Sequence, residues 1–312
     1  MPTIKLTKGM TVRTFTPVPP KFNPLKATPR ELSAYGFPAR PKDPNLLNRW
    51  TTLLSRPISV IQPKFRPLTR AAQKLPKKLV APALPNIPPP MRTNYIGGAT
   101  ATAAAAAGTV RWIEGTFTVP DVYPPAGGDS DGYPFGAWVG IFGDGSNSSL
   151  LAGWDSYVYW TGRDLKRSQY VWWRWEPGDA SYLTNFFIDL GDTINFVICL
   201  DFGSTVRARL SFNNITTSQA TTFIVTAPSG TELTGDTAAW LLNNGVYDFN
   251  GPFIARFGEM YIDECNAGTT DSPAILNPTQ LIYLTDFSDP AVDVVYANIR
   301  ASTLLQLRYV GP

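Results

Sequence analysis

The sequence predicts an all-β protein, a concanavalin A-like antiparallel β-sandwich preceded by a proline-rich, basic arm with two short helices. Composition is the first observation: the 312 residues include 29 Pro, 25 Gly, 9 Trp, 13 Tyr and 17 Phe, and only 16% are charged. Such a composition is typical of strands and turns rather than of helical bundles. The 44% of hydrophobic residues suffice for a self-supporting core.

The second observation is a strand pattern that begins at Asn94. Short runs rich in Val, Ile, Thr, Tyr, Phe and Trp alternate with turns rich in Gly, Pro, Asn and Asp. Many short strands separated by turn residues indicate a β-sandwich. The predicted strands include residues 110–119, 137–141, 157–160, 170–175, 186–190, 193–200, 206–212 and 222–225.

The third observation is an uneven distribution of charge and proline. Residues 1–93 hold 17 Lys and Arg against Glu31 and Asp43, a net charge of +15, whereas residues 94–312 hold 10 against 22, a net charge of −12. The first segment also carries 18 of the 29 prolines, and the run from Pro82 to Pro90 indicates an extended, polyproline-like strap. We therefore expect an arm over residues 1–93 and an acidic sandwich domain over residues 94–312.

Two helices are predicted within the arm. Thr28-Pro29-Arg30-Glu31 has the spacing of a capping box with proline at the first helical position, and Gly36 supplies a stop, so the first helix is expected over residues 29–35. A second helix is expected between Pro44 and Pro57, because apolar residues recur there at three- and four-residue intervals. Its apolar face comprises Leu46, Leu47, Trp50, Leu53 and Leu54.

This apolar face needs a surface to cover it, since so short a helix is marginal alone in water. We expect the arm to dock on the acidic domain of its own chain or of a neighbouring subunit, as in assemblies that exchange arms. Nucleic acid is a lower-ranked partner, because the basic residues are spread between prolines and form no dense block with stacking aromatics.

Several function classes are excluded by composition. The chain contains no histidine, which removes histidine-dependent catalytic triads and imidazole zinc sites. Cys199 and Cys265 cannot form a four-thiolate metal site, and free thiols or one disulfide remain open. No metal or cofactor is expected. The sequence shows no signal peptide and no apolar run long enough to cross a bilayer, which predicts a soluble chain and leaves its compartment unknown.

Five motifs in the predicted sandwich carry a family resemblance. In chain order they are Asn94-Tyr95-Ile96-Gly97-Gly98-Ala99, Gly115-Thr116-Phe117-Thr118-Val119-Pro120, Ala137-Trp138-Val139-Gly140-Ile141, Trp172-Trp173-Arg174-Trp175 and Thr237-Ala238-Ala239-Trp240. Over residues 94–265 the sequence resembles the glutamic peptidases, or eqolisins. The resemblance implies two large antiparallel sheets with a cleft on the concave face.

The resemblance also implies where catalytic residues would stand. In that family a glutamine and a glutamate together activate a water molecule and stabilise the tetrahedral intermediate. Here the glutamine position falls on Leu151 or Ala152, and the glutamate position falls on Ala239. Phe142 and Arg174 depart from the polar pattern as well. These substitutions predict a peptidase relative without the family's chemistry, acting in assembly or ligand binding.

An active acid endopeptidase is the alternative. It would need a non-standard pair, for example Asp155 with Glu176 or Gln169 with Asp144, and the arm would then be a propeptide-like leader.

A ligand is expected in the cleft because tryptophans are concentrated there. Indole rings bind the apolar faces of sugars or peptide side chains, and a nearby carboxylate can orient the ligand. Adjacent strand residues point to opposite faces, so one set of tryptophans faces the cleft and the other fills the core. The candidates for peptide or glycan contact are Trp138, Phe142, Asp155, Trp172, Arg174 and Trp240.

Overall fold

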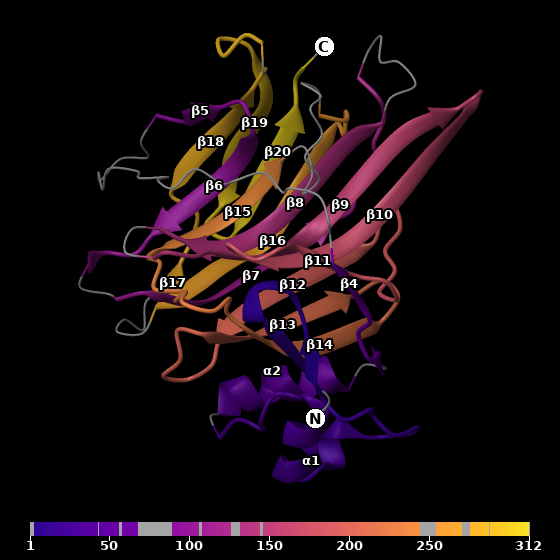
Figure 1. The fold of residues 1–312 in the computed structure, drawn as a ribbon, viewed down its shortest axis with the longest axis vertical. Helices are drawn as coiled ribbons and strands as arrows, with labels where there is room; N and C mark the ends of the chain where they lie inside the picture. The colour runs from indigo at the N-terminus through magenta and orange to yellow at the C-terminus, as the bar shows by residue number, and fades with distance from the viewer. Residues whose placement is uncertain are drawn as a thin grey trace.

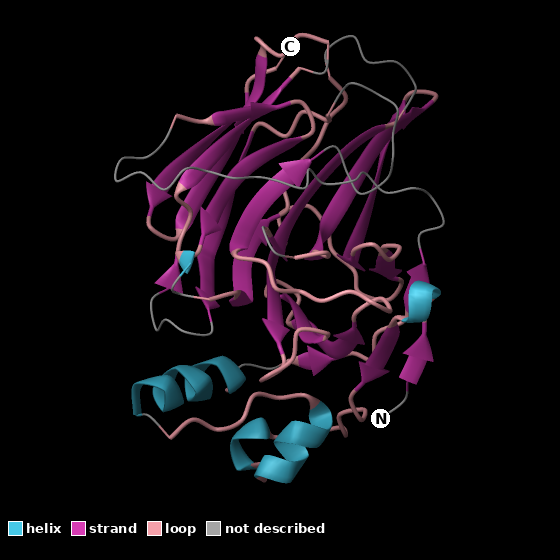
Figure 2. Ribbon diagram, turned by 60° about the vertical axis from the view of Figure 1, so that its left-hand side comes forward, coloured by secondary structure: helices cyan, strands magenta, loops and turns pink. Residues whose placement is uncertain are grey.

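The computed structural model describes residues 3–42, 44–55, 58–67, 89–105, 108–125, 132–143, 146–243, 254–269, 275–286 and 288–311. Antiparallel strands dominate these residues, and the two α-helices of the arm lie together at one end of the molecule (Figures 1 and 2). The all-β prediction is confirmed. Of the polyproline-like strap, residues 82–88 lie outside the described residues.

The first sheet carries four of the five motifs that suggested the family resemblance; the fifth, Gly115–Pro120, begins on β7 (Val110–Thr118) of the second sheet. The strands of the first sheet pair in an order that differs from their order in the chain, with β5 (Met91–Thr93) running parallel to the last of them. The order is β4 (Phe65–Pro67), β11 (Ser181–Leu183), β10 (Asp164–Trp175), β9 (Leu150–Thr161), β8 (Tyr133–Phe142), β15 (Thr237–Asn243), β6 (Ile96–Thr102) and β18 (Gln280–Thr285).

The second sheet continues from the first because β18 also pairs with β19. Two short strands are attached to it, β17 (Ile275–Leu276) on β16 and β3 (Ser59–Val60) on β14. The order is β19 (Asp293–Ala301), β20 (Leu304–Tyr309), β16 (Glu259–Thr269), β7 (Val110–Thr118), β12 (Thr193–Leu200), β13 (Arg207–Asn214), β14 (Gln219–Thr226), β2 (Thr11–Thr14) and β1 (Thr3–Lys5).

The main core lies between the two sheets. Strand β12 shows why it forms: its buried and less buried residues alternate, so that Ile194, Phe196 and Ile198 point inward. The first sheet contributes Val139 and Trp154 to the same cluster. In such strands the alternation places one face in this core and leaves the other for solvent or for further packing.

The predicted helices of the arm are confirmed at the level of their caps. Helix α1 (Pro29–Tyr35) begins at Thr28, whose hydroxyl accepts a hydrogen bond from the Glu31 N–H at 3.2 Å. The Glu31 carboxylate accepts one from the Thr28 N–H at 2.8 Å, which completes the capping box. Gly36 ends the helix at φ 80°, a conformation that glycine adopts without strain. Helix α2 (Pro44–Leu54) follows.

The arm itself covers the apolar face of α2. Trp50 and Leu54 are each 6% exposed and cluster with Leu32 of α1, and the partly buried Leu47 packs against them. The Trp50 indole N–H donates to the Pro38 carbonyl at 3.1 Å. The side chains of Leu46 and Leu53 lie outside the described residues. The surface that Trp50 required is therefore supplied locally.

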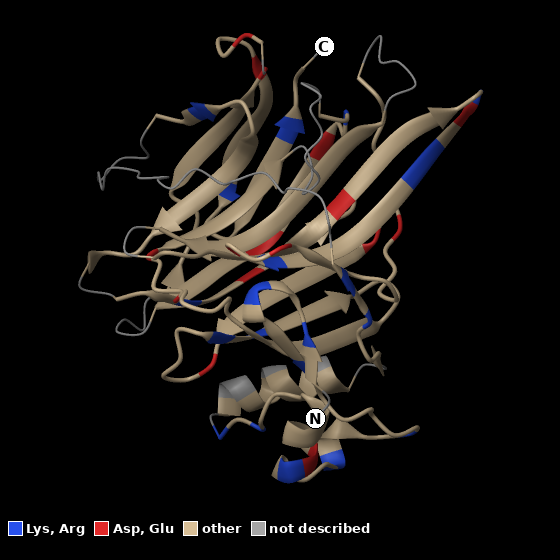
Figure 3. Ribbon diagram, in the orientation of Figure 1, with Lys and Arg blue, Asp and Glu red and all other residues tan. Residues whose placement is uncertain are grey.

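Other parts of the arm are built into the sandwich. Strand β2 pairs with β14, and Met10 and Val12, 1% and 0% exposed, belong to the main core. Phe65 of β4 packs its ring against Trp173 and Phe223. Figure 3 shows basic residues over much of the arm and largely uncharged strands in the first sheet.

The two cysteines are free thiols. Cys199 on β12 is exposed, whereas Cys265 on β16 is fully buried in the main core, and burial raises its pKa well above the ordinary value. Within the described ranges no helix is both long and apolar enough to cross a membrane.

Candidate functional site

The candidate site lies on the face of the first sheet that points away from the main core, here called the outer face. Apolar residues from neighbouring strands form a separate cluster there. Its buried members are Ile96, Trp138, Phe142, Leu151, Trp172, Ala180, Ala239, Leu241 and Ile282. Leu151 and Ala239 therefore share a face, whereas Ala152 points into the main core.

The strand register aligns Leu151 and Ala239 across the sheet. Leu151 of β9 is paired with Gly140 of β8, and Gly140 is paired with Ala239 of β15. Neighbouring strands lie about 4.8 Å apart, so the two residues flank Gly140 at a separation of about two strand spacings. Arg174 of β10 continues the row beyond Leu151.

The space above Gly140 is filled with carbon. A Cβ atom built on Gly140 would meet Leu151 Cδ2 at 2.5 Å and the Trp138 ring at 3.0 Å. Leu151 and Ala239 are 3% and 0% exposed. The three atoms nearest to this Cβ position are all carbon, so the space directly above Gly140 is apolar and packed.

The predicted ligand contacts are buried rather than open. Trp138 and Trp172 are each 1% exposed, and Phe142 is 6% exposed. The partly buried Met91, Tyr95 and Tyr182 pack against the same cluster. In this structure these aromatic residues pack against one another and their neighbours, and their contact with a ligand stays a prediction.

Trp240 corrects an expectation. It belongs to the main core, and its indole N–H donates to the Glu114 carbonyl at 2.6 Å. Since Ala239 faces outward, its sequence neighbour Trp240 must face inward, and the alternation of side chains could have revealed this from the sequence alone. Trp154, Trp173 and Trp175 also lie in the main core.

Arg174 lies at one end of the site in a local network. Its guanidinium contacts the Glu176 carboxylate at 2.8 Å and donates to the Gly178 carbonyl at 3.2 Å. Burial lowers the pKa of Arg174 below its usual value, and the carboxylates of Glu176 and Asp179 oppose that change. The Ser149 hydroxyl donates to Glu176 at 2.6 Å, which fixes this carboxylate beyond the end of β9.

Of the two non-standard pairs predicted for an active peptidase, the structure tests only one. Glu176 is bonded to Ser149, six residues along β9 from Asp155, or about 20 Å at the rise of a strand. Asp155 and Glu176 therefore do not act together. The other pair includes Asp144, which lies outside the described residues.

A different acid and amide do meet on the outer face. Asp155 of β9 and Asn243 of β15 flank Gly136 of β8 in register. A Cβ atom built on Gly136 would meet Asp155 Oδ1 at 2.2 Å and Asn243 Oδ1 at 3.1 Å. The Trp172 indole N–H donates to Asp155 Oδ1 at 2.9 Å. Sequence reasoning missed Asn243, because only strand register brings it to Asp155.

The family model of the Peptidase A4 family matches residues 94–302. This chain belongs to the Peptidase A4 family. Aspergillopepsin-2 of Aspergillus niger is 26% identical over 184 residues, in a match that covers 54% of this chain and 62% of that protein. The match thus spans less than two thirds of the curated relative.

Solved structures show that this Peptidase A4 member shares its fold with known peptidases. Scytalido-glutamic peptidase, solved with a transition state analog inhibitor, aligns with a TM-score of 0.53 and 19% identity over 70% of this chain and 98% of that chain. SCP-B, an eqolisin solved with the tripeptide Ala-Ile-His, aligns with a TM-score of 0.50 and 21% identity over the same shares. The predicted family and sandwich fold are confirmed.

Proposed function

We propose that this Peptidase A4 member is catalytically inactive and serves as a structural or ligand-binding sandwich, with its arm docked on its own sandwich domain. The observation that carries the proposal is the packed, apolar space above Gly140 between Leu151 and Ala239. By the motif resemblance, these residues stand where the family has its glutamine and glutamate.

Leucine and alanine at these positions lack both groups that water activation needs. Water activation needs a base that accepts a proton and a donor aimed at the developing oxyanion. The side chains of leucine and alanine can do neither, and Leu151 Cδ2 and the Trp138 ring crowd the space above Gly140. Removing members of a catalytic pair generally costs several orders of magnitude in rate.

A peptide-library digestion from acid to neutral pH tests inactivity. The purified chain is expected to release no products above a no-protein control, and sequence-selective cleavage that copurifies with the chain would overturn the proposal. Leu151→Gln with Ala239→Glu restores the two functional groups on one face. The matched control is Ala152→Gln with Ala239→Glu, which points the amide into the main core.

One observation favours a second candidate function, an acid endopeptidase with a non-standard pair. Asp155 and Asn243 are 2% and 6% exposed and converge above Gly136 on the same three strands. The arm would then act as a propeptide-like leader. Under this alternative, cleavage occurs at acid pH and disappears in Asp155→Asn, while Asp164→Asn at an exposed turn retains it.

Intramolecular docking of the arm is supported by strand pairing on three separate strands. Within one chain, β2 pairs with β14, β4 with β11 and β5 with β18. Light scattering at low and high salt tests this docking: a monomer at both salt concentrations is expected. Oligomers would instead indicate that arms exchange between subunits.

A further inference from the structure

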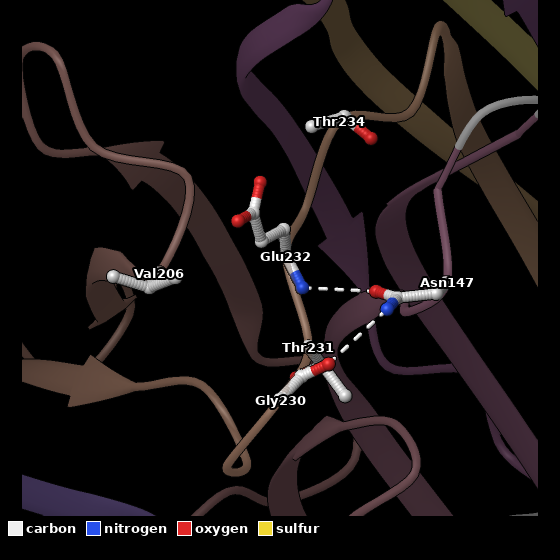
Figure 4. Close-up of a pocket in the computed structure, with 6 residues that line it drawn as sticks. All are labelled: Asn147, Val206, Gly230, Thr231, Glu232 and Thr234. Carbon is white, nitrogen blue, oxygen red and sulfur yellow. Dashed lines mark hydrogen bonds between the residues drawn. The ribbon is translucent and has the colours of Figure 1, made fainter.

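Three loops meet at one end of the sandwich. They are the connections between β8 and β9, between β12 and β13, and between β14 and β15. They enclose a pocket of about 530 Å³ (Figure 4). The lining residues are Asn147, Val206, Gly230, Thr231, Glu232 and Thr234.

The backbone of Glu232 is fixed by side chains of the β8–β9 loop. Its N–H donates to Asn147 Oδ1 at 2.9 Å, and its carbonyl accepts from the Ser148 hydroxyl at 2.8 Å and the Ser146 hydroxyl at 3.1 Å. The Asn147 amide also donates to the Gly230 carbonyl at 3.3 Å. Both chain segments are thereby held in place, so the backbone from which the Glu232 side chain projects is fixed at the rim of the pocket.

The Glu232 carboxylate is the charged group of the pocket. Figure 4 shows it pointing away from Asn147, which bonds only the backbone of this loop. The Thr205 hydroxyl approaches Glu232 Oε2 at 3.4 Å. Among the described residues no lysine or arginine forms a salt bridge with it. A cation from outside can therefore meet this carboxylate.

The opposite wall is apolar and open. Val206 is 41% exposed and faces Glu232 across the pocket (Figure 4), and Phe202 on the same turn is fully exposed. Above Gly230, a Cβ atom would meet nothing within 4 Å. A ligand with one positive charge and a short hydrocarbon stem matches this lining, since the stem can cover Val206 while the charge meets Glu232.

The acceptors favour an ammonium over a planar cation. An ammonium carries three donors that point in different directions, whereas a guanidinium presents its donors in one plane. The Glu232 carboxylate supplies charged acceptors, and the Thr231 hydroxyl, which donates to the Pro228 carbonyl at 2.8 Å, can still accept a hydrogen bond from a second position in the lining. We propose that this pocket binds a primary alkylammonium group, from a lysine side chain of a peptide or from a free polyamine.

Ligand-observed NMR on the full chain tests the proposal with n-butylammonium as the probe. Saturation transfer to the butyl protons is expected at millimolar concentrations, since a single exposed ion pair is weak. Glu232→Gln should weaken binding about fivefold. Asp164→Asn, which removes an exposed carboxylate elsewhere, should leave binding unchanged.

The apolar wall has its own test. In the wild type, butylammonium should bind more tightly than methylammonium, and Val206→Ser should remove that difference. Equal binding of both amines by the wild type, or equal losses in Glu232→Gln and Asp164→Asn, would overturn the proposal. An unchanged thermal midpoint in each variant shows that the fold is intact.

Two further ligands distinguish the sources of the ammonium group. An acetylated, amidated Gly-Lys-Gly peptide represents a lysine side chain, and spermidine represents a free polyamine. The ligand of these two that binds more tightly, and that loses affinity in Glu232→Gln, identifies the source. If neither ligand binds, the site is contradicted. This pocket is independent of the chemistry of the outer face, so peptide digestion and amine binding can fail separately.

Discussion

The arm contains two regions that are packed in different ways. Residues 3–14 form β1 and β2, and Met10 and Val12 belong to the main core between the sheets. The helical region instead has a small cluster of its own around Leu32, Trp50 and Leu54. One stretch of basic, proline-rich chain thus includes both a part of the sandwich and a separate helical unit.

The contrast between these two regions shows that charge and proline content do not reveal how a segment is packed. A strand of four residues, β2, shares the cooperative core of the sandwich because it extends an existing sheet and buries residues on one face. A small helical cluster has little apolar area and depends on local caps. The two regions should therefore respond differently to substitution.

The largest effect is expected from Val12→Asp. Val12 is paired with Val225 and is fully buried, so an aspartate there would place an unpaired carboxylate in the main core. We expect a loss of about 3 kcal/mol or more in the free energy of unfolding. Denaturant unfolding measures this loss, and native-state alkylation of Cys265 should accelerate with it.

The matched control for Val12→Asp is Lys5→Asp on the neighbouring strand, where the side chain is exposed. It should leave the unfolding midpoint nearly unchanged. If Val12→Asp unfolds at the wild-type midpoint, β2 is not part of the main core in solution.

A local effect is expected from Trp50→Ala. This substitution removes the largest side chain of the helical cluster and its bond to the Pro38 carbonyl. We expect hydrogen exchange to become fast over residues 29–54, while the sandwich and the protection of Cys265 stay near their wild-type values. Hydrogen-exchange mass spectrometry resolves the two regions.

The control for Trp50→Ala is Thr51→Ala, which changes an exposed residue of the same helix. Simultaneous loss of protection in the helices and the sandwich strands would show that the two regions unfold as one unit, which would remove the distinction between them.

The smallest effect is a pH dependence of helix α1. The hydrogen bond from the Thr28 backbone, followed by that from its hydroxyl, lowers the pKa of Glu31. A lowered pKa means that the contribution of Glu31 is present above the ordinary pKa of glutamate and is lost as pH falls through the depressed value. We expect the first turn of α1 to fray in acid, below a pH of about 4.

Amide exchange at Glu31 measures this fraying. Thr28→Ala removes the hydroxyl half of the capping box and should reduce the change between neutral and acid pH, whereas Ser33→Ala should retain it. A change of wild-type size in Thr28→Ala would show that the acid response has another origin.

Features fixed by neighbours in the chain could be predicted. The capping box at Thr28, the stop at Gly36 and the extent of α2 depend on residues a few positions apart. The short runs of strand-forming residues between turns indicated a sandwich, and the motifs identified the family that the comparisons confirm.

Features that depend on register between strands could not be predicted in the same way. The choice between Leu151 and Ala152 stayed open until pairing with Gly140 and Ala239 assigned Leu151 to the outer face. The meeting of Asp155 with Asn243 had no local signal, because 88 positions in the chain separate residues that only one strand separates in space.

Local sequence patterns predicted the strand-rich class and the caps of α1, and the family resemblance predicts apolar residues at two positions where that family has polar ones. The tertiary structure alone decided that carbon fills the space above Gly140, that Met10 and Val12 complete the main core, and that three loops surround Glu232. The reason is the sequence separation of the interacting residues. Caps and alternation depend on residues within one turn or one strand, whereas packing, burial and converging loops depend on segments that meet only in the folded chain.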